Sequence, residues 1–369
     1  MTVTDEKNQQ LIEFFESMGY SSYAINGYKI INRYSDQEIE LDTMYNGVAL
    51  RNISHQGIIE LKGKDALDLV HRIATNSVSN LPKEGVRSTI FTTDKGRIIS
   101  LATIMNFENY QILVCDRINK MKVISWLRKY IINDDVEVND ANTKYNLLEL
   151  SGPQAESFAT LICGNIISEI LPGTFRIVHT ENILFFVIKL PGERNKNKFW
   201  FLADFENSKR LINYMNENKC VFNFSMIGED AYNIYRVEHG LPTSPNELSD
   251  EYNPHEAGLI DLVDFEKGCY IGQEVIARLQ NYDKVQKRLV GVKFDHSIDN
   301  YNNNGQLILE ENGNEAGKVT SYVLSHKFKV PIGLAYVRNN FLKPGTQLSV
   351  KYSEDKPVNA EVYPLPFIK

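Results

Sequence analysis

Strand and helix patterns alternate along the chain from Gly47 to Asn216, and after Arg288 they give way to strands separated by turns. Segment 64–73 has helical apolar spacing between two strand-like runs, and a similar order recurs after residue 144. The turns after Arg288 are Asn304-Gly305, Asn312-Gly313 and Pro344-Gly345. The predicted fold class is therefore α+β, with two related N-terminal α+β units and a C-terminal antiparallel β-barrel-like domain.

These patterns divide the chain into four predicted segments. Gln9–Gly19 has apolar residues at helical spacing and ends in glycine, as an amphipathic helix does. The four segments are an N-terminal helical extension (1–46), the first α+β unit (47–140), the second α+β unit with the loop around Cys269 (141–287) and the barrel domain (288–369).

Composition and charge exclude several classes of protein. A chain of 369 residues that is 43% hydrophobic can bury a large core, and a net charge of −7 argues against direct nucleic-acid binding. A locally basic run at 284–293 allows RNA contact or a solvated strand edge, and the second is favoured. Without an apolar run of about 18 residues or a signal peptide, a cytoplasmic protein with no membrane association is expected.

The cysteines and histidines give no metal-binding pattern. The cysteines, Cys115, Cys163, Cys220 and Cys269, lie at least 48 positions apart, which excludes a CxxC spacing and makes a disulfide framework improbable. The seven histidines form no HxxxH or HExxH pair, and neither GxGxxG nor GxxxxGK(S/T) occurs. No metal, dinucleotide or P-loop site is therefore predicted.

The octapeptide Lys267–Glu274 (KGCYIGQE) is the strongest indication of chemistry. Its two glycines favour a tight loop, and Gln273-Glu274 suit the start of a helix. A thiol placed before a helix and near Lys267 and Arg278 would tend towards thiolate if those cations point at it. The alternative is that Cys269 is a small apolar filler in a turn, and the flanking residues favour a functional role.

This octapeptide resembles the motif Lys-Gly-Cys-aromatic-x-Gly-Gln-Glu of the YgfZ-like folate-binding proteins, which share a superfamily with the glycine-cleavage T-protein. The likeness extends from Gly47 to Lys369 through the blocks Gly47-Val48, Ser54–Gly57, Thr75-Asn76, Asp94–Gly96, Gly317–Ser321 and Gly333–Val337. The resemblance implies a folate-binding core, tetrahydrofolate or a one-carbon derivative as cofactor, and Cys269 as the catalytic residue.

Four further residues are predicted to bind the folate. The segment Arg236–Pro242 is similar to the one whose glutamate binds the pterin ring in T-proteins, so Glu238 is the first choice, since a carboxylate can accept two parallel hydrogen bonds from a pterin. Tyr270 suits an apolar wall, and Arg278 and Lys267 suit the anionic tail. The alternatives are a solvated helix-end Glu238, a core tyrosine, and a surface ion pair of Arg278.

The strand after Gly96 departs from the T-protein pattern. T-proteins carry adjacent aspartates there, whereas residues 97–102 (RIISLA) contain no carboxylate to manage a proton at the folate amine. A T-protein asparagine after the next strand corresponds to Cys115 in the alignment that we favour. This departure argues against the transferase chemistry of T-proteins.

Two leading functions of different classes follow from the resemblance. In the first, the chain is an accessory protein for assembly or repair of iron–sulfur enzymes, including a tRNA-modifying one, with Cys269 as thiolate or transient cluster ligand. In the second, it is a tetrahydrofolate-dependent aminomethyltransferase or related demethylase. A folate-binding protein without a catalytic step is the third alternative. The expected partners are a folate and, for the first function, iron–sulfur proteins.

Overall fold

The chain forms two compact units, which are described separately. The computed structural model describes residue 10 and residues 13–19, 21–25, 28–192, 197–282, 285–298, 307–311, 313–351 and 358–368. The first unit comprises Met1–Thr89 and Leu101–Tyr232, and the second comprises Ile90–Ser100 and Asn233–Lys369. A short segment from the first predicted α+β region, Ile90–Ser100, thus belongs to the C-terminal unit.

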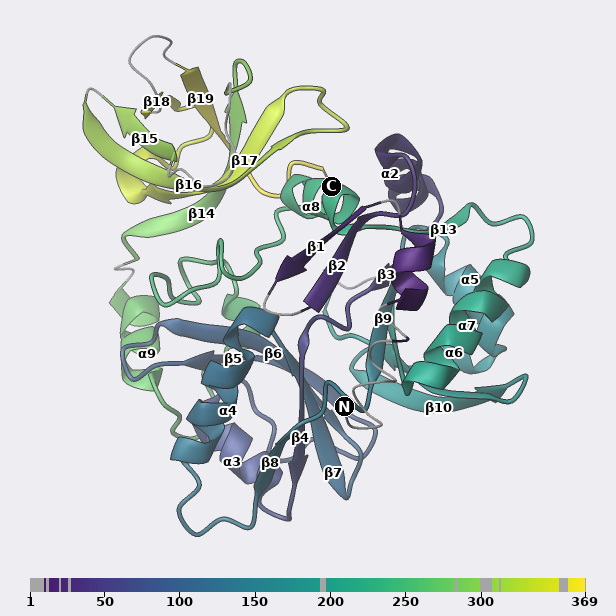
Figure 1. Cartoon of the computed structure of the whole chain (residues 1–369). Coiled ribbons are helices and arrows are strands. Elements are labelled where there is room, and N and C mark those ends of the chain that lie inside the picture. The colour runs from purple at the N-terminus through teal and green to yellow at the C-terminus, as the bar shows by residue number, and fades with distance from the viewer. Residues whose placement is uncertain are drawn as a thin grey trace. The chain divides into compact units, whose positions relative to one another are not determined.

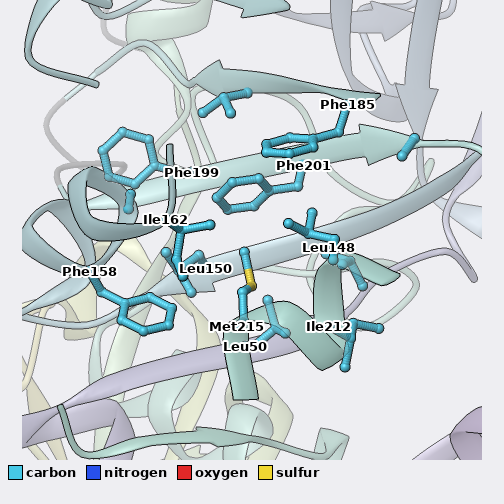
Figure 2. Packing of buried hydrophobic residues seen from close by; sticks show 14 of the residues in the cluster. Leu50, Leu148, Leu150, Phe158, Ile162, Phe185, Phe199, Phe201, Ile212 and Met215 are labelled. Carbon is cyan, nitrogen blue, oxygen red and sulfur yellow. The ribbon is translucent and has the colours of Figure 1, made fainter. Parts of the chain in front are cut away.

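A six-stranded sheet with helices on one face forms the main core of the first unit. Its spatial order is β10 (Thr174–Thr180), β11 (Ile183–Lys189), β12 (Lys198–Ala203), β9 (Asn146–Ser151), β3 (Val48–Asn52) and β13 (Phe224–Met226). The helices α5 (Ala155–Cys163), α6 (Ile166–Glu169) and α7 (Phe205–Glu217) contribute further buried side chains. Figure 2 shows Phe201 and Leu148 of the sheet close to Met215 of α7. Asp204 caps α7 by accepting a hydrogen bond from the Asn207 N–H.

A five-stranded sheet lies mainly in this unit, except for the part within Ile90–Ser100, which belongs to the second unit. Its order is β5 (Val86–Thr92), β6 (Ile98–Asn106), β7 (Tyr110–Cys115), β4 (Gly57–Lys62) and β8 (Glu137–Asp140), accompanied by α3 (Ala66–Ile73), η1 (Arg117–Asn119) and α4 (Lys120–Lys129). Ile58 and Ile112 of this sheet share one buried cluster with Leu147 and Ile188 of the six-stranded sheet. The two sheets are therefore joined by a common apolar layer.

The N-terminal segment is helical only in part. Residues 13–18 are helical, but β1 (Ser21–Ile25) and β2 (Tyr28–Arg33) form an antiparallel hairpin before α2 (Gln37–Asn46). The β-branched pair Ile30 and Ile31 is buried in β2, where such residues pack well. The predicted helical extension over 1–46 therefore also contains a β-hairpin.

The second unit ends in a closed antiparallel barrel, as predicted (Figure 1). Its order is β14 (Lys287–Phe294), β17 (Pro331–Arg338), β16 (Asn314–Leu324), β15 (Leu307–Glu311), β18 (Gln347–Lys351) and β19 (Val358–Tyr363), with η4 (Asn339–Phe341) after β17. β14 pairs with both β17 and β19, so the favoured solvated strand edge at 284–293 is wrong for β14. Gly345 has φ +89° in its turn, whereas Asn304-Gly305 and Asn312 lie outside the described residues.

Three helical elements precede this barrel in the chain. Helix α8 (Glu229–Glu238) is followed by a long proline-containing loop, by η3 (Ile260–Leu262) and by α9 (Gln273–Tyr282). Of the residues predicted to form the site, Glu238 ends α8 and Arg278 lies on α9. The other three, Lys267, Cys269 and Tyr270, lie between η3 and α9. None of the described helices combines the length and apolar character needed to cross a membrane.

Candidate functional site

The Cys269 loop, defined here as residues 263–272, connects η3 to α9. Its first turn is held by Asp264, whose Oδ1 accepts hydrogen bonds from the backbone N–H groups of Glu266 (2.9 Å) and Lys267 (3.1 Å). Tyr270 packs with Val263 and Ile276 in a small buried cluster. The loop backbone is therefore fixed so that Tyr270 points inward while its neighbour Cys269 is exposed.

Gly272 closes this loop in a conformation that only glycine adopts easily. Its φ is +88°, and a Cβ there would lie 2.5 Å from the Thr93 carbonyl oxygen. One residue earlier, the Ile271 carbonyl accepts a hydrogen bond from Thr92 Oγ1 at 2.9 Å. Of the two glycines predicted to allow a closely approached loop, Gly272 has that role, whereas a Cβ at Gly268 would meet nothing within 4 Å.

The two predicted cations differ in their surroundings. Lys267 is 9% exposed, and its Nζ lies 5.0 Å from the centre of the Tyr270 ring. Burial lowers the pKa of Lys267 to about 8, although Asp264 opposes that shift. Arg278 lies on the exposed side of α9. Lys267 is thus a buried cation close to an aromatic ring, whereas Arg278 is open to solvent.

Cys269 and Tyr270 present two different polar groups. Within the part of the chain that the structure describes, the Cys269 thiol makes no hydrogen bond, and the side chain is exposed. The Tyr270 hydroxyl is buried and likewise has no hydrogen-bond partner among the described residues. Burial, with Asp264, raises the pKa of Tyr270 to about 12, so the phenol stays protonated and can donate one hydrogen bond.

Glu238, the last residue of α8, is completely buried. Its Oε1 accepts hydrogen bonds from Ser325 Oγ (2.5 Å) and from the Lys327 N–H (2.9 Å), and its carbonyl oxygen accepts from Phe367 and Ile368. Its Oε2 has no partner among the described residues. The carboxylate therefore holds a turn of the barrel and keeps one oxygen uncommitted, and its pterin role stays a prediction.

The strand that lacks the T-protein aspartates packs against a carboxylate from elsewhere in the sequence. Arg97 Nη1 lies 3.2 Å from Glu256 and donates to the Glu251 carbonyl oxygen at 2.9 Å. Glu256 is almost fully buried, and burial raises its pKa even though Lys287 and Arg97 oppose the shift. Sequence reasoning missed Glu256 because it lies in an irregular loop without a recognisable spacing.

Cys115, the other cysteine considered, lies at the end of β7 and is buried. Burial, reinforced by Asp116, raises the pKa of its thiol well above the usual range. A Cβ at Gly57 would lie 2.9 Å from its Sγ, so the thiol fills space against the neighbouring strand. Cys115 is a packing residue.

The first unit contains a buried charge network that the sequence did not indicate. Arg51 on β3 faces Glu149 on the neighbouring β9 at 3.1 Å and Glu229 at 3.2 Å, and its guanidinium carbon lies 3.2 Å from the centre of the Tyr232 ring. Trp200 Nε1 donates to the second Glu149 oxygen at 3.0 Å. The alternating strand pattern gives no sign of this network, because its members are far apart in the chain.

No metal site is formed by the residues described. No group of three or more His, Cys, Asp and Glu side chains in the described ranges is arranged to hold a metal ion. A cluster bound at Cys269 would therefore need ligands from another molecule or from outside those ranges.

Comparison with known proteins gives matches along most of the chain. A model of the GCVT N-terminal domain matches residues 11–186, and one of the glycine cleavage T-protein C-terminal barrel domain matches residues 287–369. The chain is 25% identical over 366 residues to an aminomethyltransferase of Bacillus licheniformis, which covers 98% of this chain and 99% of that one. It is 26% identical over 354 residues to a protein of Arabidopsis thaliana named as a chloroplastic transferase, covering 92% and 76% of the two chains.

A solved structure has the same fold. Glycine cleavage system aminomethyltransferase T from Bartonella henselae superimposes with a TM-score of 0.83 over 96% of each chain, at 20% identity. At that identity the likeness concerns the fold alone.

Proposed function

The chain belongs to the glycine cleavage T-protein family, and on that premise we propose that it binds tetrahydrofolate and supports assembly or repair of iron–sulfur proteins through Cys269. The observation that carries this proposal is the exposed thiol on a loop whose backbone is fixed on both sides of it. A core cysteine needs no such presentation, whereas a soft sulfur ligand that meets an iron centre does.

Two buried polar atoms support folate binding. The Tyr270 hydroxyl and Glu238 Oε2 have no hydrogen-bond partners among the described residues, and such atoms are rare unless a ligand or water satisfies them. A carboxylate oxygen accepts from a pterin amino group, and a phenol donates to a ring or amide acceptor. On this ground we propose Glu238 and Tyr270 as folate contacts. Lys267 and Arg278 are proposed as further contacts because their positive charges suit the anionic tail of a folate.

Each proposed contact has a task suited to its surroundings. Glu238 holds the pterin edge, and because Glu238 is completely buried, the residues around it must move apart to admit the ring. Arg278 binds the anionic glutamate tail from the solvent side. The folate, when bound, carries the one-carbon unit. At neutral pH Lys267 remains mostly protonated with a pKa of about 8, so it supplies positive charge close to the loop. The cytoplasm is the proposed location.

The comparisons are also consistent with a second function. Relatives that match almost the full length are named aminomethyltransferases, and the chain covers 99% of one of them. The absence of a carboxylate between residues 97 and 102 counts against proton transfer from that strand. Glu256, a carboxylate with a raised pKa that contacts Arg97, is the candidate replacement for the missing aspartates. Transfer of an aminomethyl group to tetrahydrofolate is therefore the alternative proposal.

One set of assays separates the two functions. Calorimetry with tetrahydrofolate tests binding, and rescue of iron–sulfur enzyme activity in cells lacking this protein tests the accessory role. Cys269→Ala should abolish rescue, and Cys220→Ala, which removes another exposed cysteine, should leave it intact. Aminomethyl transfer from the lipoyl carrier protein that persists in Cys269→Ala would support the transferase function. Failure of well-folded protein to bind any reduced folate would refute the shared premise.

A further inference from the structure

The turn between β5 and β6 contacts the Cys269 loop directly. Thr92 is completely buried, and its Oγ1 donates to the Ile271 carbonyl oxygen at 2.9 Å, a bond between residues 179 positions apart. Both residues belong to the second unit. The bond fixes the peptide that lies two positions after Cys269.

Glycine contacts make this junction close-packed. The missing side chain of Gly272 leaves room for the Thr93 carbonyl oxygen, which a Cβ would approach to 2.5 Å. The same Cβ would lie 3.2 Å from the Cα of Gly96, a turn residue with φ +67°. The turn and the start of α9 therefore fit together with backbone against backbone.

The turn is itself anchored on its other side. The Ile98 N–H donates to the Tyr252 carbonyl oxygen at 2.9 Å, and Arg97 binds the Glu251 carbonyl oxygen and Glu256. A support that is fixed at a second point can hold the loop in one conformation. Residues 97–102 meanwhile carry no carboxylate, so this part of β6 has no acid or base to contribute.

We infer that Thr92 is a positioning residue for Cys269, and that the β5–β6 turn supports the thiol-bearing loop instead of supplying acid–base chemistry. This inference rests on the proposed role of Cys269. The Thr92 hydroxyl satisfies the Ile271 carbonyl, and the methyl group and the β-branch fill the buried space, so the hydrogen bond can be removed with little change in volume by Thr92→Val.

The test compares three full-length variants. Thr92→Val removes the hydrogen bond, and Thr92→Ser keeps the hydroxyl. Thr320→Val is a matched control, because Thr320 Oγ1 donates to the Leu334 carbonyl oxygen at 3.1 Å within the barrel of the same unit. Hydrogen exchange of amides 268–272 is followed by mass spectrometry. A nitroxide attached to Cys269, in a Cys220→Ser background, reports the mobility of the loop.

The expected result is an about tenfold faster exchange of amides 268–272 in Thr92→Val, because one hydrogen bond shifts local opening by about that factor. The nitroxide spectrum should narrow, and rescue of iron–sulfur enzymes should fall with it. Thr92→Ser should stay within about twofold of wild type, as should Thr320→Val. Equal exchange in Thr92→Val and Thr320→Val, or acceleration spread evenly over the second unit, would overturn the inference.

Failure of the Thr92 inference can be distinguished from failure of the proposed function. If the protein binds no folate and rescues no iron–sulfur enzyme, the proposed function fails, while the exchange and nitroxide measurements still report whether Thr92 positions the loop. If rescue depends on Cys269 but the nitroxide and exchange are unchanged in Thr92→Val, only the positioning inference is refuted.

Discussion

Arg51 in the first unit and Lys267 in the second are both buried cations that lie over a tyrosine ring, yet their surroundings differ. Arg51 contacts Glu149 and Glu229, and although burial alone would lower its pKa, Glu149, Tyr232 and Glu229 raise the pKa above its usual range. For Lys267, burial outweighs the attraction of Asp264 and lowers the pKa to about 8. A buried charge that is paired with two carboxylates serves the fold, whereas one whose pKa is lowered is better suited to a functional site.

The largest effect is expected when the compensated network of the first unit is broken. Arg51→Met leaves Glu149 buried without its guanidinium, and breaking such a pair typically costs about 3–5 kcal/mol. Urea denaturation of the variant should show that loss in the free energy of unfolding. Arg33→Met is the matched control, because Arg33 pairs with Asp230 at 2.8 Å on a half-exposed surface, where a pair is worth under about 1 kcal/mol. Equal losses in the two variants would show that the Arg51 network stabilises the protein no more than a surface ion pair does, and the contrast with Lys267 would then have no basis.

Acid should weaken the same network. Burial alone would raise the pKa of Glu149, but Lys198, Arg51 and Trp200 together lower it to about 2 from an ordinary 4.5. A carboxylate with a lowered pKa in the folded state stabilises above pH 4.5, and that stability is lost as pH falls towards 2. The loss attributable to Glu149 is about 3 kcal/mol.

Urea denaturation between pH 6 and pH 2 measures this loss. Glu149→Gln is less stable than wild type at pH 6 and should lose less stability on acidification, so the two stability curves converge towards pH 2. Parallel curves would show that the carboxylate is not held ionised by its neighbours.

The thiols of the two units extend the comparison. Burial raises the pKa of Cys115 above its usual range, while Cys269 is exposed. Iodoacetamide at pH 8 should modify Cys269 at least about a hundredfold faster than Cys115 in the folded protein. Mass spectrometry of the alkylated peptides measures both rates, with exposed Cys220 as the reference for an accessible thiol. Similar rates at Cys115 and Cys269 would contradict the assignment of Cys115 as a packing residue.

Local patterns in the sequence predicted much of this fold. The barrel followed from strands separated by turns such as Pro344-Gly345, and helix α9 followed from the start signal at Gln273-Glu274. The hairpin β1–β2 was missed because the helix predicted for Gln9–Gly19 was taken to represent the whole segment 1–46. The spacing of apolar residues and the turn residues specify such local structure, whereas the pairing of strands also depends on contacts with distant parts of the chain.

For the candidate site, the sequence indicated only those structural features whose residues are close together in the chain. The octapeptide located Cys269, Tyr270 and the tight turn at Gly272, because these features depend on neighbouring residues. The Thr92–Ile271 hydrogen bond depends on tertiary packing across 179 positions, and no local pattern indicates it. For Glu238 the sequence offered a pterin-binding role and, as the alternative, a solvated helix end; the structure excludes the solvated alternative, because the side chain is completely buried.

The smallest effect is expected for Lys267, and its sign is opposite to that of Glu149. Unfolded lysine keeps its proton to about pH 10.5, whereas folded Lys267 loses it from about pH 8, so the unfolded state binds more protons between these values. Stability should therefore rise with pH through this window, by about 1 kcal/mol after allowance for partial contact with solvent. Urea denaturation of wild type and Lys267→Met between pH 7 and pH 10 isolates the contribution, and Lys122→Met, an exposed lysine variant, should keep the wild-type slope. If Lys267→Met also keeps that slope, the Lys267 ammonium is as well compensated as the Arg51 guanidinium, and the distinction between a structural and a functional buried cation fails for this protein.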